Sequence, residues 1–355
     1  MFIMRAKAQT AIFIIVLAIA TVALFSTNAL AQYKETVLVS NQAGVALLQD
    51  PDLVNGWGLT RAPASPFWVS DNVAGVSTLY RGNGTKVPLT VTIPAASASA
   101  TGTPTGTVFN ITVLTATPGF AVSKGATSAP ALFLFDTLDG TISGWNPGVD
   151  PTHAQIAVNR SGAGAVYTGL AIADSSSGAF LYAADNGPNS RVDVFDSQFN
   201  LVKSFTDPDI NGGFAPYGIQ NLNGNIWVTF GGNKSASGFV DEFDTDGNLL
   251  KHVAVNGPLH SPWGLAMAPA DFGPFSGALL VANNIPKGRI DAFDPNTGTF
   301  LGVLRDMTGQ AIEIDQLWAI EFGNTGNNGA PNQLFFTAGP NNYANGMFGR
   351  ITVGP

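Results

Sequence analysis

The hydrophobic residues of this chain gather in short runs that are separated by clusters of Gly, Asn, Asp and Ser. One stretch shows the pattern plainly, with runs at Gly169 to Ala173, Leu181 to Ala184, Arg191 to Phe195 and Leu201 to Phe205. Short runs bounded by turn-forming residues predict β-strands. The runs do not alternate cleanly with polar residues, which predicts sheets that are buried on both faces. We therefore expect a unit of four short strands.

This unit recurs along the chain. Each copy opens with a short apolar element, and these elements end at Leu59, Phe109, Leu170, Ile219, Leu265 and Ile320. The six positions lie 50, 61, 49, 46 and 55 residues apart. A regular period of about 50 residues, with four strands in each repeat, is typical of β-propeller blades. The sequence therefore predicts an all-β fold, a six-bladed β-propeller of four-stranded antiparallel blades.

The last repeat predicts how the ring closes. It supplies three strands before the sequence stops at Pro355, and its fourth strand is missing. The segment Glu35-Thr-Val-Leu-Val-Ser40, ahead of the first repeat, has the composition of that strand. We expect this N-terminal strand to pair with the last blade beside Phe348 to Val353, because closure leaves no unpaired blade edge.

Two stretches do not fit the repeat. Ala95 to Thr107 is a low-complexity run of Ala, Ser, Thr, Gly and Pro, and Ser123 to Pro130 is a shorter polar stretch. Such composition lacks the apolar residues that a packed strand needs. We expect residues 95–107 to form a flexible insertion between the first two blades.

The first 31 residues have the order of a processing signal. Arg5 and Lys7 precede an apolar run from Ala11 to Phe25, and Ala29-Leu30-Ala31 is a small-x-small motif. This order is typical of a secretory signal peptide, and the run is shorter than the roughly 20 residues of a membrane helix. A retained membrane anchor is the alternative. We expect cleavage, a single propeller domain over residues 32–355, and a secreted product, extracellular or periplasmic, without a membrane anchor.

Charge and composition exclude several function classes. Without the leader, 14 Lys and Arg stand against 24 Asp and Glu, a net charge of −10. Nucleic acid binding requires a clustered basic face, so we exclude nucleic acid as a partner. The chain has no cysteine, which excludes disulfides and thiolate chemistry. It also has no Gly-x-Ser-x-Gly elbow, zinc-protease helix motif or phosphate-binding loop, so we assign no catalytic residue.

Tyr182-Ala-Ala-Asp-Asn186 followed by Arg191-Val-Asp-Val-Phe-Asp196 resembles NHL-type propeller repeats. Three further motifs are Pro216-Tyr-Gly-Ile219, Ser261-Pro-Trp-Gly-Leu265 and Asp139-Gly-Thr-Ile-Ser-Gly-Trp145. Together they resemble a family of uncharacterised secreted bacterial six-bladed propellers, over roughly Tyr33 to Val353. The resemblance implies the fold and export, and it implies no particular reaction.

A more distant similarity is to regucalcin and gluconolactonase-like propellers, which are metal-dependent lactone hydrolases. This similarity implies an Asp metal ligand just before the Gly of an inner strand. The matching positions here are Trp57, Thr107, Thr168, Tyr217, Trp263 and Trp318. None carries a carboxylate, so lactonase chemistry would need a rearranged metal site. Its ligands would be Asp71, Asp136, Asp185 and Asn283.

One rim of the propeller gathers the candidate binding residues. Consecutive strands of a blade are antiparallel, so the first strand begins where the second one ends. The aromatic residues at this rim are Trp57, Tyr217, Trp263 and Trp318. The polar residues are Asp71, Asn72, Asp136, Asp185, Asn186, Asn283, Asn284 and His260. Aromatic faces beside hydrogen-bonding groups predict a site for a sugar or another amphipathic ligand. The alternative is that the aromatic residues plug the channel and the Asp-Asn pairs close hairpin turns.

Two further acidic features are interpreted as structural. Asp193, Asp241 and Asp291 recur at one position in three repeats, where we expect hydrogen bonds between blades, and Arg191 and Arg289 are expected ion partners for two of them. Asp207-Pro-Asp-Ile-Asn-Gly212 matches the opening of an EF-hand loop. Gly218 stands where that loop needs a bidentate Glu, so we interpret the motif as an inter-blade loop.

These observations predict a secreted, monomeric, non-catalytic binding or scaffolding propeller. It would engage an extracellular carbohydrate or protein through the rim that bears the aromatic residues. The alternative is a metal-dependent lactonase-like hydrolase. No cofactor is expected, with calcium as the alternative, because Asp and Asn oxygens are ligands that suit this ion.

Overall fold

Strands dominate the computed structural model, which describes residues 32–210, 213–232, 238–255 and 257–354. The expected signal peptide, residues 1–31, lies outside this range. In the described part of the chain, no helix is both long enough and apolar enough to cross a bilayer.

Each of the first three blades is an antiparallel sheet. Blade 1 consists of β3 (Gly56–Arg61), β4 (Phe67–Asp71), β5 (Val76–Tyr80) and β6 (Lys86–Thr92). Blade 2 consists of β7 (Pro104–Phe109), β10 (Phe133–Thr137), β11 (Thr141–Trp145) and β12 (Gln155–Asn159). Blade 3 consists of β13 (Tyr167–Ser175), β14 (Gly178–Asp185), β15 (Arg191–Phe195) and β16 (Leu201–Phe205).

The remaining blades repeat this order. Blade 4 consists of β17 (Phe214–Leu222), β18 (Asn225–Gly232), β19 (Gly238–Phe243) and β20 (Leu249–Val255). Blade 5 consists of β21 (Pro262–Met267), β22 (Leu279–Asn283), β23 (Ile290–Phe293) and β24 (Phe300–Val303). Blade 6 consists of β25 (Leu317–Phe322), β26 (Leu334–Ala338), β27 (Met347–Val353) and β1 (Tyr33–Ser40). The described residues thus form the six-bladed propeller that the repeat predicts.

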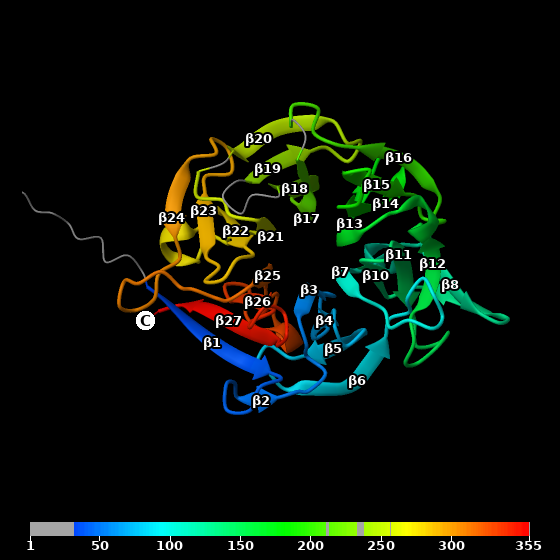
Figure 1. The fold of residues 1–355 in the computed structure, drawn as a ribbon, viewed down its shortest axis with the longest axis horizontal. Helices are drawn as coiled ribbons and strands as arrows, with labels where there is room; N and C mark the ends of the chain where they lie inside the picture. The colour runs from blue at the N-terminus through cyan, green and yellow to red at the C-terminus, as the bar shows by residue number, and fades with distance from the viewer. Residues whose placement is uncertain (1–31, 211–212, 233–237, 256, 355) are drawn as a thin grey trace, which may run out of the picture. The chain divides into compact units, whose positions relative to one another are not determined.

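The inner strand of each blade packs against the inner strand of the next, and β25 packs against β3 to complete the ring (Figure 1). Glycine allows this close approach. A Cβ atom at Gly58 would lie 2.2 Å from the Thr105 carbonyl oxygen, and one at Gly218 would lie 2.0 Å from the Trp263 carbonyl oxygen. The glycines at these two positions are therefore required by contact between blades.

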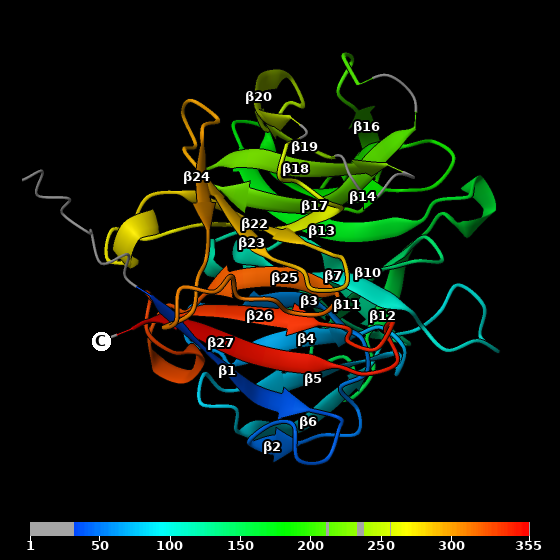
Figure 2. The ribbon, with the colours of Figure 1, turned by 60° about the vertical axis from the view of Figure 1, so that its left-hand side comes forward.

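Closure of the ring by the N-terminal strand is confirmed. β1 runs antiparallel to β27, with Glu35 opposite Ile351 and Val39 opposite Phe348 (Figure 2). A two-residue strand, β2 (Leu48–Gln49), pairs parallel with β1 and adds a fifth strand to this sheet. The two ends of the described chain therefore meet in one blade.

The expected insertion at residues 95–107 is shorter than the sequence suggested. Pro104–Phe109 is β7, and Thr105 and Thr107 are buried. The small residues at 104–107 are needed here because an inner strand must pack closely against both neighbouring blades. Ser123 to Pro130 falls within an added hairpin of β8 (Ala121–Lys124) and β9 (Thr127–Pro130).

The core lies in the middle strands. Every residue of β4, β10, β11, β22 and β26 is buried, whereas the outer strands β6, β12, β16 and β24 each keep exposed positions. Stacked blades bury both faces of a sheet, which explains why these strands are apolar at successive positions. The described connections include four 3₁₀ turns, η1 (Ile111–Leu114), η2 (Ser161–Ala163), η3 (Gly273–Phe275) and η4 (Gly326–Asn328).

Candidate functional site

The four predicted aromatic residues meet at one end of the central channel. The Trp57 and Trp318 rings are stacked, with centroids 3.6 Å apart and planes 15° apart. The Trp263 ring stands edge-on to both, at 5.2 and 4.5 Å, and Tyr217 stacks on Trp263 at 4.4 Å. Much of the flat surface of these rings is therefore covered by contact with one another.

This cluster narrows the channel. Trp57 and Trp318 are buried, and the Trp318 Nε1–H donates to Asn55 Oδ1 over 2.7 Å. The space between the six inner strands is about 50 Å³, whereas a pocket for a small organic ligand needs roughly 300 Å³ or more. The geometry favours the alternative in which these aromatic residues plug the channel.

The three predicted Asn residues that follow an Asp or Asn link neighbouring blades. Each side-chain amide donates to a carbonyl oxygen of the next inner strand. The Asn72 amide donates to Pro104 over 3.1 Å, the Asn186 amide to Pro216 over 3.3 Å and the Asn284 amide to Leu317 over 3.2 Å. These bonds give the repeated Asn a structural role.

The carboxylates of the predicted rim lie in separate blades. Asp185 Oδ1 accepts the backbone N–H groups of Val166 and Gly187, both over 2.9 Å, and so closes a turn of its own blade. Asp136 Oδ1 accepts the Thr105 hydroxyl over 2.7 Å, and burial raises the pKa of Asp136 to about 7. Burial also raises the pKa of Asp71. Among the described residues, these three do not form a group that could share one metal ion.

The Asp that recurs in three repeats has a different setting in each blade. In blade 3, Asp193 Oδ1 accepts Arg191 Nε–H and the Ser204 hydroxyl, both over 2.8 Å. Its Oδ2 accepts the Tyr167 hydroxyl over 3.0 Å and lies 3.3 Å from Arg160 Nε. Two guanidinium groups therefore neutralise this buried carboxylate, and the expected Arg191 pairing is confirmed.

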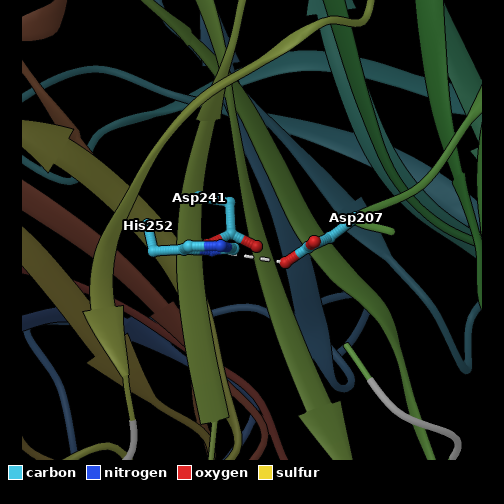
Figure 3. A group of neighbouring side chains, drawn as sticks. All are labelled: Asp207, Asp241 and His252. Carbon is cyan, nitrogen blue, oxygen red and sulfur yellow. Dashed lines mark hydrogen bonds and ion pairs between the residues drawn. The ribbon is translucent and has the colours of Figure 1, made fainter. Parts of the chain in front are cut away.

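In blade 4, the equivalent Asp241 faces a second carboxylate. The His252 Nδ1 atom lies 3.0 Å from Asp241 Oδ1 and 3.4 Å from Asp207 Oδ2 (Figure 3). Asp207 comes from the connection between blades 3 and 4, the motif that we interpreted as an inter-blade loop. In the described residues, Asp207, Asp241 and His252 are the one group of three acidic or imidazole side chains close enough to share a metal ion.

In blade 5, the equivalent Asp291 borders a pocket. Its Oδ2 accepts the Asn283 amide over 2.9 Å, and burial raises the pKa of Asp291 to about 6. The expected Asp291–Arg289 pair is replaced, because Arg289 Nη2 donates to Glu313 Oε1 over 2.8 Å, across the connection to blade 6. Val303 stands opposite Asp291 on β24, and both residues line the pocket.

The blade 5 pocket has a volume of about 580 Å³. Its polar lining consists of His260, Asn283, Lys287, Arg289, Asp291 and Arg305. Its apolar lining includes Phe300, Pro258 and Pro286. His260 and Asn283 were predicted at this rim, and the His260 backbone N–H donates to Asn283 Oδ1 over 2.6 Å. Asp291 and Arg289 were recognised as repeated residues but interpreted as structural, and the remaining lining residues carry no repeat signal.

Comparison with solved structures shows the propeller fold. A glucose dehydrogenase matches with a TM-score of 0.54 at 12% identity, over 91% of this chain and 99% of that one. A PQQ-bound aldose sugar dehydrogenase from Streptomyces coelicolor matches with a TM-score of 0.53 at 14% identity, over 90% and 99%. A streptogramin B lyase matches with a TM-score of 0.52 at 12% identity, over 91% and 97%.

Sequence comparison finds relatives in a virus. No family model matches the chain. Two proteins of Acanthamoeba polyphaga mimivirus, named uncharacterized protein L690 and uncharacterized protein R648, are each 30% identical to it over 342 residues. The alignments cover 91% of this chain, 87% of L690 and 81% of R648. The chain therefore belongs to the same protein family as the mimivirus proteins L690 and R648.

Proposed function

We propose that the protein is a non-catalytic binding propeller that takes an acidic saccharide, a sugar bearing a carboxylate, in the pocket of blade 5. The observation that carries this proposal is the pocket of about 580 Å³ beside Asp291. This volume lies within the range of roughly 300–1,000 Å³ that is usual for ligand sites. Two of its lining residues, His260 and Asn283, belong to the predicted rim, and Phe300, Gly302 and Val303 belong to the outer strand β24.

The lining chemistry suits such a ligand. Lys287, Arg289 and Arg305 are cationic. Lys287 and Arg289 both pair with Glu313, so Arg305 is the cation best placed to receive a ligand carboxylate, and an arginine fork matches that group. Phe300 is 44% exposed and offers a flat apolar face to a sugar ring. The Asp291 carboxylate can accept a hydrogen bond from a sugar hydroxyl group, and the Asn283 side chain holds that carboxylate in place. Three kinds of contact that an acidic sugar requires thus surround one space.

The same lining argues for binding without hydrolysis. Glycoside hydrolysis generally uses two carboxyl groups that flank the scissile bond. Among the described residues that line the pocket, Asp291 is the single carboxylate. Its Oδ2 is held by the Asn283 amide.

A glycan array tests this function with the mature chain. Saccharides that contain a uronic acid should bind, and their neutral counterparts should bind at least about tenfold more weakly. Arg305→Ala and Phe300→Ala should each reduce the affinity about tenfold. Leu201→Ala is the matched control, because Leu201 starts the outer strand of blade 3 as Phe300 starts that of blade 5. Equal binding of neutral and acidic sugars, or unchanged binding by both pocket variants, would contradict the proposal.

We further propose that the protein is exported and that its N-terminal leader is removed. The positive start, apolar run and Ala29-Leu30-Ala31 motif support this proposal, as does the resemblance to NHL-type repeats of secreted bacterial propellers. The intact mass of the mature product should correspond to a chain that begins at Gln32. A mass that includes residues 1–31 would refute cleavage.

A further inference from the structure

The repeat position occupied by Asp193 and Asp241 has opposite electrostatics in blades 3 and 4. In blade 3, the connection from the preceding blade brings Arg160 to the carboxylate, whereas in blade 4 it brings Asp207. The residue two positions before the Asp changes from Arg191 to Phe239. Blade 4 has therefore exchanged two guanidinium groups for a second carboxylate.

On the outer strand, blade 4 gains a basic side chain at the position opposite the Asp. Ser204 stands opposite Asp193 on β16, and His252 stands opposite Asp241 on β20. The Nδ1 side of the imidazole thus faces two carboxylates that come from separate segments (Figure 3). The exchanged residues assemble a set of metal-ligating groups at a place where blade 3 has an ion-paired structural carboxylate.

The distances suit a single ion. The ligand atoms of Asp207, Asp241 and His252 all lie within 4.8 Å of one another, and the imidazole nitrogen is 3.0 and 3.4 Å from the two carboxylate oxygens. Ligands held about 2.0–2.2 Å from one tetrahedral ion lie about 3.3–3.6 Å apart. Small side-chain adjustments would therefore complete the coordination geometry.

Both carboxylates present an atom that the protein leaves without a hydrogen bond. Asp207 and Asp241 are 3% and 0% exposed, and the Oδ2 atom of each is buried without a hydrogen-bond partner. Asp207 Oδ1 accepts the Asp209 backbone N–H over 2.7 Å, which orients its Oδ2 toward the imidazole. Buried polar atoms are normally satisfied, and a divalent cation would satisfy these two buried oxygens beside one imidazole.

A fourth residue orients the imidazole. Asp209 Oδ2 lies 3.4 Å from His252 Nε2, on the side of the ring away from the two buried carboxylates. A carboxylate that accepts the Nε2–H leaves Nδ1 as the lone-pair atom, and this pairing is typical of histidines that bind metals.

We propose that Asp207, Asp241 and His252 bind one divalent cation of the zinc or manganese class, with Asp209 as a positioning residue. Two carboxylates and one imidazole suit these ions, whereas calcium prefers a shell made of oxygens alone. The His252 side chain is 37% exposed, which gives an ion and a water ligand access from solvent. The site lies in blade 4 and shares no residue with the blade 5 pocket, so a test of metal binding is independent of the test of saccharide binding.

Titration calorimetry on the mature chain, stripped with chelator, tests the site with zinc, manganese and calcium chlorides. One equivalent of zinc or manganese should bind, and His252→Ala should weaken binding at least about 100-fold. Asp209→Asn should weaken it about tenfold. The matched control is His153→Ala, because His153 pairs with a single carboxylate, Asp150, and its loss should leave binding unchanged.

Two further measurements separate metal binding from a folding defect. Saturating zinc should raise the melting temperature of the wild type but not that of His252→Ala. Cobalt should give a visible absorption band that His252→Ala abolishes. Asp241→Asn should fold and melt no lower than the stripped wild type, because it removes one of two adjacent buried charges, yet it should lose the metal. No stoichiometric binding of zinc or manganese, calcium binding alone, or unchanged zinc affinity in His252→Ala would overturn the proposal.

Discussion

Blades 3 and 4 place an Asp at the same position of the same strand, yet they surround it with different chemistry. Asp193 has two arginines and two hydroxyl groups, whereas Asp241 has a second carboxylate and an imidazole. Blade 5 leaves a pocket beside the third copy, Asp291. The repeated strands therefore set where the carboxylate stands. The connections and outer strands decide whether it is structural, metal-binding or part of a pocket.

Loss of the blade 3 cations should have the largest effect on stability. Replacing Arg160 and Arg191 together by Ala leaves Asp193 buried and uncompensated, which should lower the free energy of unfolding by about 3–5 kcal/mol. Arg289→Ala is the control at the same repeat position as Arg191. Arg289 pairs with a partly exposed Glu313, so its loss should cost no more than about 1 kcal/mol. Urea unfolding measures the free energy of unfolding of the double variant and of Arg289→Ala. Equal decreases in the two would contradict a special role for the arginines of blade 3.

Asp291 in blade 5 should make a measurable contribution to the pH dependence of stability. The pKa of Asp291 is raised from 3.8 to about 6 by burial, so the folded state holds this proton more tightly than the unfolded state does. The resulting stabilisation is complete below pH 3.8 and is lost as the pH rises through about 6. Between pH 4 and 7.5, wild type should lose on the order of 2 kcal/mol relative to Asp291→Asn. Urea unfolding at several pH values tests this, and parallel pH profiles would contradict it.

Neutralising the repeated carboxylate should have opposite consequences in blades 3 and 4. Asp193→Asn weakens charge-assisted bonds to two arginines and should cost about 2 kcal/mol at pH 7. Asp241→Asn in chelator should cost nothing or stabilise the fold, because burial and the adjacent Asp207 raise the pKa of Asp241. Thermal unfolding of both variants measures the difference: the melting temperature should fall in Asp193→Asn but not in Asp241→Asn. A marked loss of stability in Asp241→Asn would assign Asp241 the structural role of its blade 3 counterpart.

The smallest effect concerns the exposed residues at the start of the outer strands. Phe300 and Leu201 are 44% and 36% exposed, so Phe300→Ala and Leu201→Ala should each change the free energy of unfolding by no more than about 1 kcal/mol. Binding of an acidic saccharide should fall only in Phe300→Ala. A large loss of stability in this variant would mean that Phe300 serves the core rather than the pocket.

Much of the architecture could be predicted because each signal is local or recurs at a fixed period. The opening elements around Trp57, Tyr217 and Trp263 lie in inner strands, and Glu35 to Ser40 completes the last blade. Residues 104–107 were assigned to a loop because their composition is that of a linker. Contact between blades, which sequence composition does not show, makes them a strand.

The candidate sites were much less predictable. The position of the aromatic residues at one rim followed from strand direction, but their mutual stacking depends on how six blades meet at the axis. Asp207 belongs to a local loop motif and Asp241 to a repeated strand position, so nothing in the sequence connects the two residues. His252 carried no signal beyond its position in a strand.

The number of blades, the strands within each blade, the ring closure and the gathering of the aromatic residues at one rim could be predicted from the sequence. These properties follow from hydrophobic patterning and strand direction, which act over a few residues or repeat at a constant interval. The contact of Asp207 and His252 with Asp241, and the pocket beside Asp291, depend instead on the folded structure. Such contacts join a connection, a middle strand and an outer strand, and the distance between them is set by how the blades pack.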